Sequence, residues 1–154
     1  MCIAYKHLYP GPPVASKMRY SKGGAHSPMS SDRNTKRVLI ADDKPTGREL
    51  VRTVLENTGY EVFEASDGIE ALESAHRLRP DLIILDLHMP GLDGFGVIKE
   101  LRLDAHFATT PVVALTASAM QGDRQRALLA GFTGYITKPV SLKALRAEVE
   151  RLLA

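Results

Sequence analysis

The chain has 154 residues, of which 44% are hydrophobic and 25% charged, values typical of one soluble globular domain with a short extension. Its apolar runs are no longer than strands, which excludes a membrane span, and its single cysteine, Cys2, excludes an internal disulfide. The net charge of +2 does not indicate nucleic-acid binding, because residues 1–36 hold six of the 20 basic residues and one of the 18 acids, which leaves residues 37–154 with a formal charge of −3.

The N-terminal residues 1–35 are rich in Pro, Gly, Ser and Lys and show no sustained helical or strand period. We predict a disordered leader over residues 1–35 and a folded domain over residues 36–154. Met29, followed by SSDRNTKR, is a plausible translation start, and we hypothesise that the preceding residues are absent from the native protein, which mass spectrometry can test. Because the leader has no apolar signal segment and the chain has one cysteine, we expect a reducing, cytoplasmic setting.

Beyond the leader, short apolar runs alternate with segments whose apolar residues recur at helical spacing. The run VLIA (38–41) predicts a strand that ends at two acids, Asp42 and Asp43. Pro45 marks the start of a helix that Gly59 ends, and YEVFEA (60–65) predicts the second strand. The apolar face of the first helix includes Leu50, Val51, Val54 and Leu55, and that of a second helix after the SDG turn includes Ile69, Leu72 and Ala75.

The second half of the chain repeats this alternation three more times. LIIL (82–85) is wholly apolar, as is typical of a strand that is buried on both faces. PVVALT (111–116) and GYIT (134–137) predict the fourth and fifth strands. The predicted helices contain Phe95, Val97, Ile98 and Leu101; then Arg124, Ala127, Leu128 and Leu129, ending at Gly131; and finally Leu142, Leu145, Val149, Leu152 and Leu153.

Five alternating strands and helices predict an α/β fold of βαβ units, with a doubly wound five-stranded parallel sheet and helices on both faces. In sheets of this kind, ligands bind outside the carboxyl ends of the strands, where the strand order reverses. The functional residues are therefore expected at that edge of the sheet.

The residues that end the predicted strands have matching chemistry. The first strand ends at Asp42 and Asp43, the third at Asp86, the fourth at Thr116, and the fifth reaches Lys138. Three carboxylates at one edge repel one another unless a cation neutralises them, and oxygen ligands of this kind suit Mg²⁺. A lysine and a hydroxyl opposite the acids can bind an anionic group, so the set predicts a site for a phosphoryl group.

Asp86 is the expected nucleophile, because it ends the strand predicted to be the most buried one. A carboxylate can attack phosphorus to give an aspartyl-phosphate, with catalysis mostly by positioning and charge neutralisation. Asp42 or Asp43 is also expected to cap the helix that begins at Pro45.

The segments VLIADD, LIILDLHMPGLDG, VVALTA and YITKPV occur in this order, each at the end of a predicted strand. Over residues 36–154 the chain closely resembles the receiver domain of bacterial two-component response regulators, which has a flavodoxin-like (βα)₅ fold. The resemblance implies a phosphorelay switch that takes a phosphoryl group from phosphohistidine of a histidine kinase or histidine phosphotransfer protein, rather than a turnover enzyme. It also implies Mg²⁺ as the cofactor and a downstream protein as the target.

The resemblance assigns a role to each site residue. Asp86 matches the phospho-acceptor and a metal ligand, Asp43 the acid that binds Mg²⁺ directly, and Asp42 its partner, which acts through water. The backbone carbonyl of His88 matches the third protein ligand. The His88 side chain lies at a position that tunes phosphate lifetime in the family, as does Ser118, and a solvent-facing side chain is the alternative for His88.

The switch and phosphate-binding residues follow from the same resemblance. Thr116 matches the hydroxyl that moves onto the phosphoryl oxygens, and Tyr135 the aromatic residue that swings inward. Lys138 matches the phosphate-pairing lysine, and the Lys138–Pro139 peptide is expected to be cis. The helix after the fourth strand, with the fifth strand and Tyr135, is the expected output surface, with Asp123, Arg124 and Arg126 exposed to a partner.

Because the chain stops at Ala154, directly after the last predicted helix, we expect a stand-alone regulator with no DNA-binding domain. We expect no direct contact with DNA or membrane, and output by protein contact. A homodimer through the last two helices stays open.

Two alternatives remain. A Mg²⁺-dependent phosphatase similar to haloacid dehalogenases needs a second acid two residues after the nucleophile, where this chain has His88, and a cap over the substrate. A non-catalytic flavodoxin-like module needs a Ser/Thr-rich phosphate loop after the first strand, where this chain has the acidic segment DDKPTG.

Overall fold

The computed structural model describes residues 34–118 and 120–154. The predictions for the leader and for a start at Met29 therefore lie almost wholly outside the described residues. The strands are β1 (Arg37–Ala41), β2 (Glu61–Ala65), β3 (Leu82–Asp86), β4 (Val112–Thr116) and β5 (Gly134–Thr137). The helices are α2 (Pro45–Asn57), α3 (Gly68–Leu78), α4 (Gly94–Leu103), α5 (Gln121–Ala130) and α6 (Leu142–Leu153), with a 3₁₀ turn, η1 (Ala105–Phe107).

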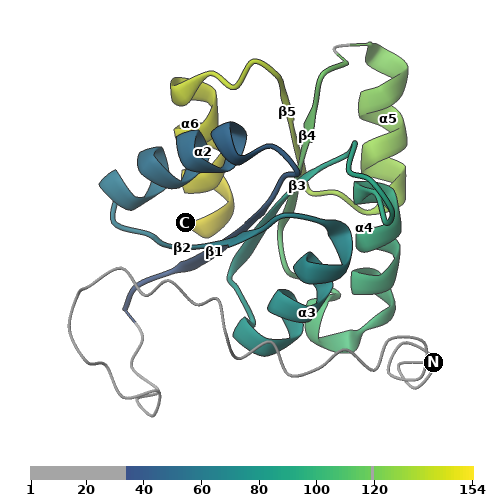
Figure 1. Ribbon diagram of the computed structural model, residues 1–154, viewed down its shortest axis with the longest axis horizontal. Helices are drawn as coiled ribbons and strands as arrows, with labels where there is room; N and C mark the ends of the chain where they lie inside the picture. Colours follow the sequence, from purple (N-terminus) through teal and green to yellow (C-terminus); the bar gives the residue numbers. More distant parts are fainter. Residues whose placement is uncertain (1–33, 119) are drawn as a thin grey trace. The chain divides into compact units, whose positions relative to one another are not determined.

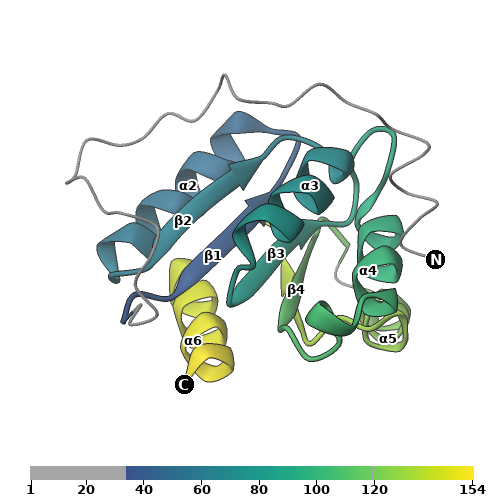
Figure 2. The ribbon, with the colours of Figure 1, turned by 90° about the horizontal axis from the view of Figure 1, so that it is seen from below.

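The five strands form one parallel sheet with the order β2-β1-β3-β4-β5, which confirms the predicted fold class. Helices α2 and α6 cover one face of the sheet, and α3, α4 and α5 cover the other (Figure 1 and Figure 2). The strand order reverses between β1 and β3, so the switch point lies at the carboxyl end of β1 and the central strand β3.

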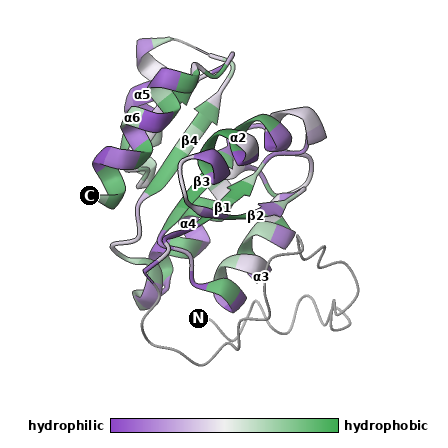
Figure 3. Ribbon diagram, turned by 90° about the vertical axis from the view of Figure 1, so that its left-hand side faces the viewer, coloured by the Kyte–Doolittle hydropathy of each residue, from purple (hydrophilic) through white to green (hydrophobic). Residues whose placement is uncertain are grey.

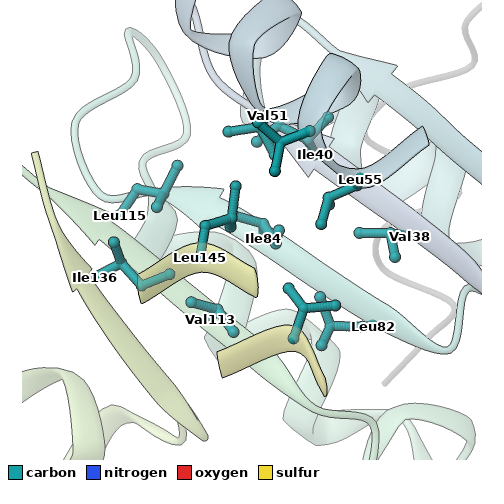
Figure 4. Close-up of a cluster of buried hydrophobic side chains, with 12 residues drawn as sticks. Val38, Ile40, Val51, Leu55, Leu82, Ile84, Val113, Leu115, Ile136 and Leu145 are labelled. Carbon is teal, nitrogen blue, oxygen red and sulfur yellow. The ribbon is translucent and has the colours of Figure 1, made fainter. Parts of the chain in front are cut away.

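The main hydrophobic core lies between the sheet and the helices α2 and α6 (Figure 4). Alternate residues of the strands point to this side because successive side chains of a strand face opposite sides of the sheet. Leu145 of α6 lies over Ile84 and Val113 (Figure 4). The buried cluster comprises Val38, Ile40, Val51, Val54, Leu55, Leu82, Ile84, Val113, Leu115, Ile136, Leu145 and Val149.

The central strands β3 and β4 are apolar, whereas the helices carry both polar and apolar residues (Figure 3). All five residues of β3 are buried, as its apolar run at 82–85 predicted, and all five residues of β4 are buried as well. Leu50 and Leu142, which were expected on buried helix faces, are instead exposed. Each lies at the flank of an apolar stripe that is centred on other residues of its helix.

Local signals in the sequence set the helix starts. Pro45 is in the first turn of α2, and the residue before it, Lys44, is the N-cap. The expectation that Asp42 or Asp43 caps α2 is therefore wrong, because the chain needs two further residues to turn from β1 into the helix. Side-chain oxygens of Asp67, Asp93 and Ser141 cap α3, α4 and α6.

Across the described segments 34–118 and 120–154, none of the helices combines the length and apolar character that crossing a bilayer requires.

Candidate functional site

The parallel register places the strand-ending residues at one edge of the sheet. Ala41 of β1 is level with Leu85 of β3, Asp86 is level with Leu115 of β4, and Thr116 is level with Thr137 of β5. The residues that follow on each strand therefore emerge side by side at the switch point of the sheet.

Three carboxylates meet there. Asp42, Asp43 and Asp86 each offer one oxygen, and these oxygens all lie within 4.8 Å of one another. Asp42 is 1% exposed and Asp86 4%, so two of the charges are almost withdrawn from water. Their mutual repulsion has to be balanced by a cation.

Lys138 supplies part of that balance. Its Nζ donates to Asp86 Oδ2 at 2.7 Å and to Asp42 Oδ2 at 3.0 Å. Burial by itself would lower the pKa of the Lys138 ammonium, but the hydrogen bonds to Asp86 and Asp42 raise it above its ordinary value. Burial opposes ionisation of Asp42, yet the backbone N–H of Lys44 and the Lys138 ammonium lower the pKa of Asp42.

One ammonium among three carboxylates leaves the site with excess negative charge. One of the carboxylate oxygens is also buried without a hydrogen-bond partner. Within the described part of the chain, Asp43 Oδ1 is the buried side-chain oxygen that lacks any hydrogen-bond partner. An acceptor buried without a donor is costly, unless a cation is its partner. Oxygen ligands of three acids at this spacing fit a hard divalent cation such as Mg²⁺.

The loop after Asp86 holds that side chain firmly. The backbone N–H of His88 donates to Asp86 Oδ1 at 2.9 Å, while the His88 side chain is exposed. Gly91 has φ +77°, a left-handed conformation that glycine tolerates best. A Cβ at Gly94 would lie 2.6 Å from the Asp86 carbonyl oxygen, so a glycine is needed for α4 to begin this close to β3.

A chain of hydroxyl groups links the site to α5. The Ser118 N–H donates to Thr116 Oγ1 at 3.1 Å, and the half-buried Tyr135 donates its hydroxyl to the Ser118 carbonyl. The Ser118 hydroxyl in turn donates to the Asp123 carboxylate in the first turn of α5. The expectation that Asp123 is a solvent-exposed contact is therefore wrong, since it is half-buried and bound to Ser118, whereas Arg124 and Arg126 are exposed as expected.

Helix α5 itself is lightly packed. Among its residues, all of which the structure describes, only Ala127 is buried, and Leu129 is 88% exposed. Leu128 and Met120 are also exposed. The helix that adjoins the hydroxyl network thus presents apolar surface to solvent.

The structure brings the sequence-predicted site residues together at the strand ends, with the His88 backbone beside them: Asp42, Asp43, Asp86, Thr116 and Lys138. The Lys138–Pro139 peptide is cis, as expected. The sequence reasoning missed the bond from Ser118 to Asp123 and a bond from Arg48 to the Asp42 carbonyl. Asp123 sits where an acid is common in the first turn of a helix, and this was the one available signal for it.

The chain is similar to known proteins. A family model described as the response regulator receiver domain matches residues 38–150. The chain is 43% identical over 126 residues to the probable transcriptional regulator ycf27 of Guillardia theta, covering 81% of this chain and 48% of the relative. It is 40% identical over 108 residues to the polar-differentiation response regulator DivK of Brucella ovis, covering 70% and 88%. The chain thus spans about half the length of the first relative and most of the second.

Solved structures give the same picture. The chemotaxis response regulator CheY4 of Vibrio cholerae superposes with a TM-score of 0.74 at 35% identity, covering 77% of this chain and 99% of that one. The receiver domain of the sensor histidine kinase PA1611 of Pseudomonas aeruginosa PAO1, with a magnesium ion coordinated in its active-site cleft, gives a TM-score of 0.72 at 35% identity, covering 77% and 98%.

Proposed function

The chain belongs to the response regulator receiver domain family, and from this premise we propose that its Asp86 carboxylate accepts a phosphoryl group from phosphohistidine in a Mg²⁺-dependent reaction. The donor is a histidine kinase or a histidine phosphotransfer protein. The phosphorylated chain acts as a signalling switch with altered protein-protein contacts, rather than as an enzyme that turns over a small substrate.

The main support is the arrangement of Asp86 between a lysine and two further acids. Lys138 contacts the Asp86 carboxylate, and Asp43 presents a buried oxygen without a partner beside it. A set of acids that served only the stability of the fold would have each buried oxygen paired. A set of acids that binds a cation and then a phosphoryl group would leave a buried oxygen unpaired until the cation binds.

The proposed metal ligands are Asp42, Asp43, Asp86 and the His88 backbone carbonyl. The mixed surroundings of carboxylate and backbone oxygens are those that Mg²⁺ prefers. When bound, Mg²⁺ neutralises negative charge on the acids and on the incoming phosphoryl oxygens.

In the transfer step, an Asp86 oxygen attacks phosphorus, so that a new O–P bond forms as the P–N bond to the donor imidazole breaks. The imidazole nitrogen keeps the electron pair of the broken bond, and the proton on the other ring nitrogen of the donor makes the departing imidazole neutral. Lys138 then has a phosphoryl oxygen as its partner in place of a carboxylate oxygen, and its ammonium stabilises the charge that moves onto that oxygen. Thr116 donates its hydroxyl to the same group.

We propose that the signal leaves the site through the hydroxyl network. A movement of Thr116 toward the phosphoryl group pulls on the Ser118 N–H that it binds, and Ser118 holds both Tyr135 and Asp123. The first turn of α5 then shifts between two arrangements, and the exposed face of α5 contacts a downstream protein. Residues 37–154 have a formal charge of −3, and we propose no direct contact of this domain with DNA.

The experiment is intact-protein mass spectrometry after incubation with acetyl phosphate, with Mg²⁺ and with a chelator. We expect one added phosphoryl group, only with Mg²⁺ and not in Asp86→Asn. The matched control is Asp93→Asn, an exposed acid that caps α4 and can be replaced by another good capping residue. Phosphorylation of Asp86→Asn to the same extent as the unmodified chain would overturn the proposal. If no variant gains mass, the test is repeated with a phosphorylated histidine phosphotransfer protein, and no gain then rejects it.

A further inference from the structure

We propose that Arg48, in the first turn of α2, is a positioning residue for the metal site, which it serves by fixing the peptide that joins Asp42 to Asp43. The inference rests on the proposed Mg²⁺ site and adds a residue that lies outside the acids themselves. Spacing alone does not reveal Arg48, because it acts on a backbone atom.

The first contact is with the backbone of the site. Arg48 Nη1 donates to the Asp42 carbonyl oxygen at 2.8 Å, and the Arg48 side chain is 18% exposed. Hydrogen bonds from a charged donor are stronger than neutral ones, and partial burial removes competing water. The Asp42 carbonyl is thus held by a side chain rather than by the helix or the sheet.

The second contact fixes the guanidinium itself. Arg48 Nε lies 3.5 Å from Glu64 Oε1, and Glu64 is on β2, level with Ile40 of β1. The other oxygen of Glu64 accepts a hydrogen bond from Arg52 Nη1 at 2.6 Å. Glu64 is therefore anchored to the sheet next to β1 and directs Arg48 at the end of that strand.

The remaining polar atoms of Asp42 are also engaged. Its N–H donates to the Ala65 carbonyl at 3.2 Å, Oδ1 accepts from the Lys44 N–H at 2.9 Å, and Oδ2 accepts from Lys138 at 3.0 Å. A Cβ at Gly47 would lie 2.5 Å from Asp42 Oδ2, so the first turn of α2 also leaves room for this carboxylate. These contacts hold the Asp42 backbone and side chain in one position in the site.

The consequence falls on Asp43. A peptide unit is planar, so a hydrogen bond that fixes the Asp42 carbonyl also fixes the direction in which the chain enters Asp43. Asp43 Oδ1 is, among the described residues, the buried side-chain oxygen without a hydrogen-bond partner. Outer contacts that orient metal ligands typically change metal affinity about 10- to 100-fold when they are removed.

The test is calorimetric titration of the full chain with Mg²⁺. We compare the unmodified protein with Arg48→Met, Arg48→Lys and the matched control Arg52→Met, which removes the other cation from Glu64 without touching Asp42. We expect the Kd for Mg²⁺ to rise about tenfold in Arg48→Met. We expect a smaller rise in Arg48→Lys, which keeps one donor, and a change of less than about twofold in Arg52→Met.

A second readout separates positioning from a general loss of structure. If Arg48 acts through the metal ligands, the rate of phosphorylation by acetyl phosphate in Arg48→Met falls at low Mg²⁺ and recovers at saturating Mg²⁺. Should Arg48→Met fail to fold by circular dichroism, Glu64→Gln replaces it, with a rise in the Kd for Mg²⁺ above that of Arg52→Met expected.

Equal Mg²⁺ affinity in Arg48→Met and Arg52→Met, with tight binding by the unmodified chain, would reject the role of Arg48 and leave the proposed function intact. A rate deficit that persists at saturating Mg²⁺ would also reject it. If the unmodified chain binds no Mg²⁺, the proposed metal site falls, and the inference falls with it.

Discussion

Asp43 is the residue at which stability and function are most clearly opposed. Its Oδ1 is buried without a donor, and it adds a third negative charge to a site that holds one ammonium. Such groups persist in proteins because function needs them, at a cost to the free energy of folding. The same oxygen that destabilises the metal-free protein can serve as a ligand for a divalent cation.

We therefore predict that Asp43→Asn raises the free energy of unfolding by about 1 kcal/mol in the presence of a chelator, because it relieves like-charge repulsion. Excess Mg²⁺ should raise the melting temperature of the unmodified protein, since a ligand that binds only the native state stabilises it, and should have little effect on the variant. Thermal denaturation followed by circular dichroism measures both. A variant less stable than the unmodified protein in chelator would contradict this account of Asp43.

Asp104 gives a prediction about pH away from the site. The backbone N–H of His106 lowers the pKa of Asp104 from its ordinary 3.8, partial burial opposes this, and His76, whose Nε2 lies 3.1 Å away, lowers it further. Since the folded-state pKa lies below the unfolded value, the charge stabilises the fold above about pH 3.8, and this contribution is lost as the pH falls through the folded-state value.

Asp104→Asn keeps a capping side chain and removes the charge. We expect the variant to be less stable than the unmodified protein at pH 6, with the difference shrinking at pH values below 3.8. Urea unfolding at the two pH values measures it. A difference that is the same size in acid would show that the Asp104 charge does not stabilise the fold.

At this scale the sequence predicted where the acids, Thr116 and Lys138 lie, because each ends or directly follows a strand in a short motif. Their roles stay predictions. It could not predict Arg48, whose partner is a backbone carbonyl, since spacing says nothing about where a carbonyl points. It misjudged Asp123 for a related reason: an acid on a polar helix is normally solvated, and only the fold brings Ser118 within reach.

Helix α5 differs from the other helices in how it is held. It buries only Ala127, and its two ends depend on polar contacts: the hydroxyl network at the start, and Arg102 of α4 at the finish. Arg102 donates twice to the Gly131 carbonyl, at 3.0 and 2.8 Å, and also to the carbonyls of Phe107 and Thr110. Burial lowers the pKa of this guanidinium, and no acid is among these partners. Arg102 thus joins the ends of α4 and α5.

We predict that Arg102→Met lowers the free energy of unfolding by about 2 kcal/mol, because several half-buried carbonyls lose a charged donor. The control is Lys99→Met, an exposed residue of the same helix, with an expected change within about 0.5 kcal/mol. Chemical denaturation compares the two. Equal effects of both substitutions would indicate that the Arg102 contacts add nothing to stability.

The elements themselves were mostly predictable, because hydrophobic runs of strand length and apolar residues at helical spacing are strong signals. Strands β3 and β4 are as fully buried as their apolar sequences indicated. The exposure of Leu128 and Leu129 could not be predicted from the sequence pattern. Two leucines beside an alanine look like a packed face in sequence, and only the fold shows that they face solvent.

For the whole molecule, the alternation of strands and helices was sufficient to predict a doubly wound parallel sheet, since parallel strands require crossover helices. The strand order then brings the acids, the hydroxyl and the lysine to one edge, although they are up to 96 residues apart in sequence. Partner and pathway are not encoded in that geometry, because they depend on surfaces such as α5 whose complement lies on another protein.

The central claim is that Asp86 takes the phosphoryl group. The most direct measurement is reduction of the acetyl phosphate-treated protein with borohydride, which converts an aspartyl-phosphate to homoserine, followed by peptide sequencing by mass spectrometry. The account predicts homoserine at position 86 alone, and only when Mg²⁺ was present during phosphorylation. Homoserine at Asp42 or Asp43 instead, or at position 86 to the same extent without Mg²⁺, would contradict it.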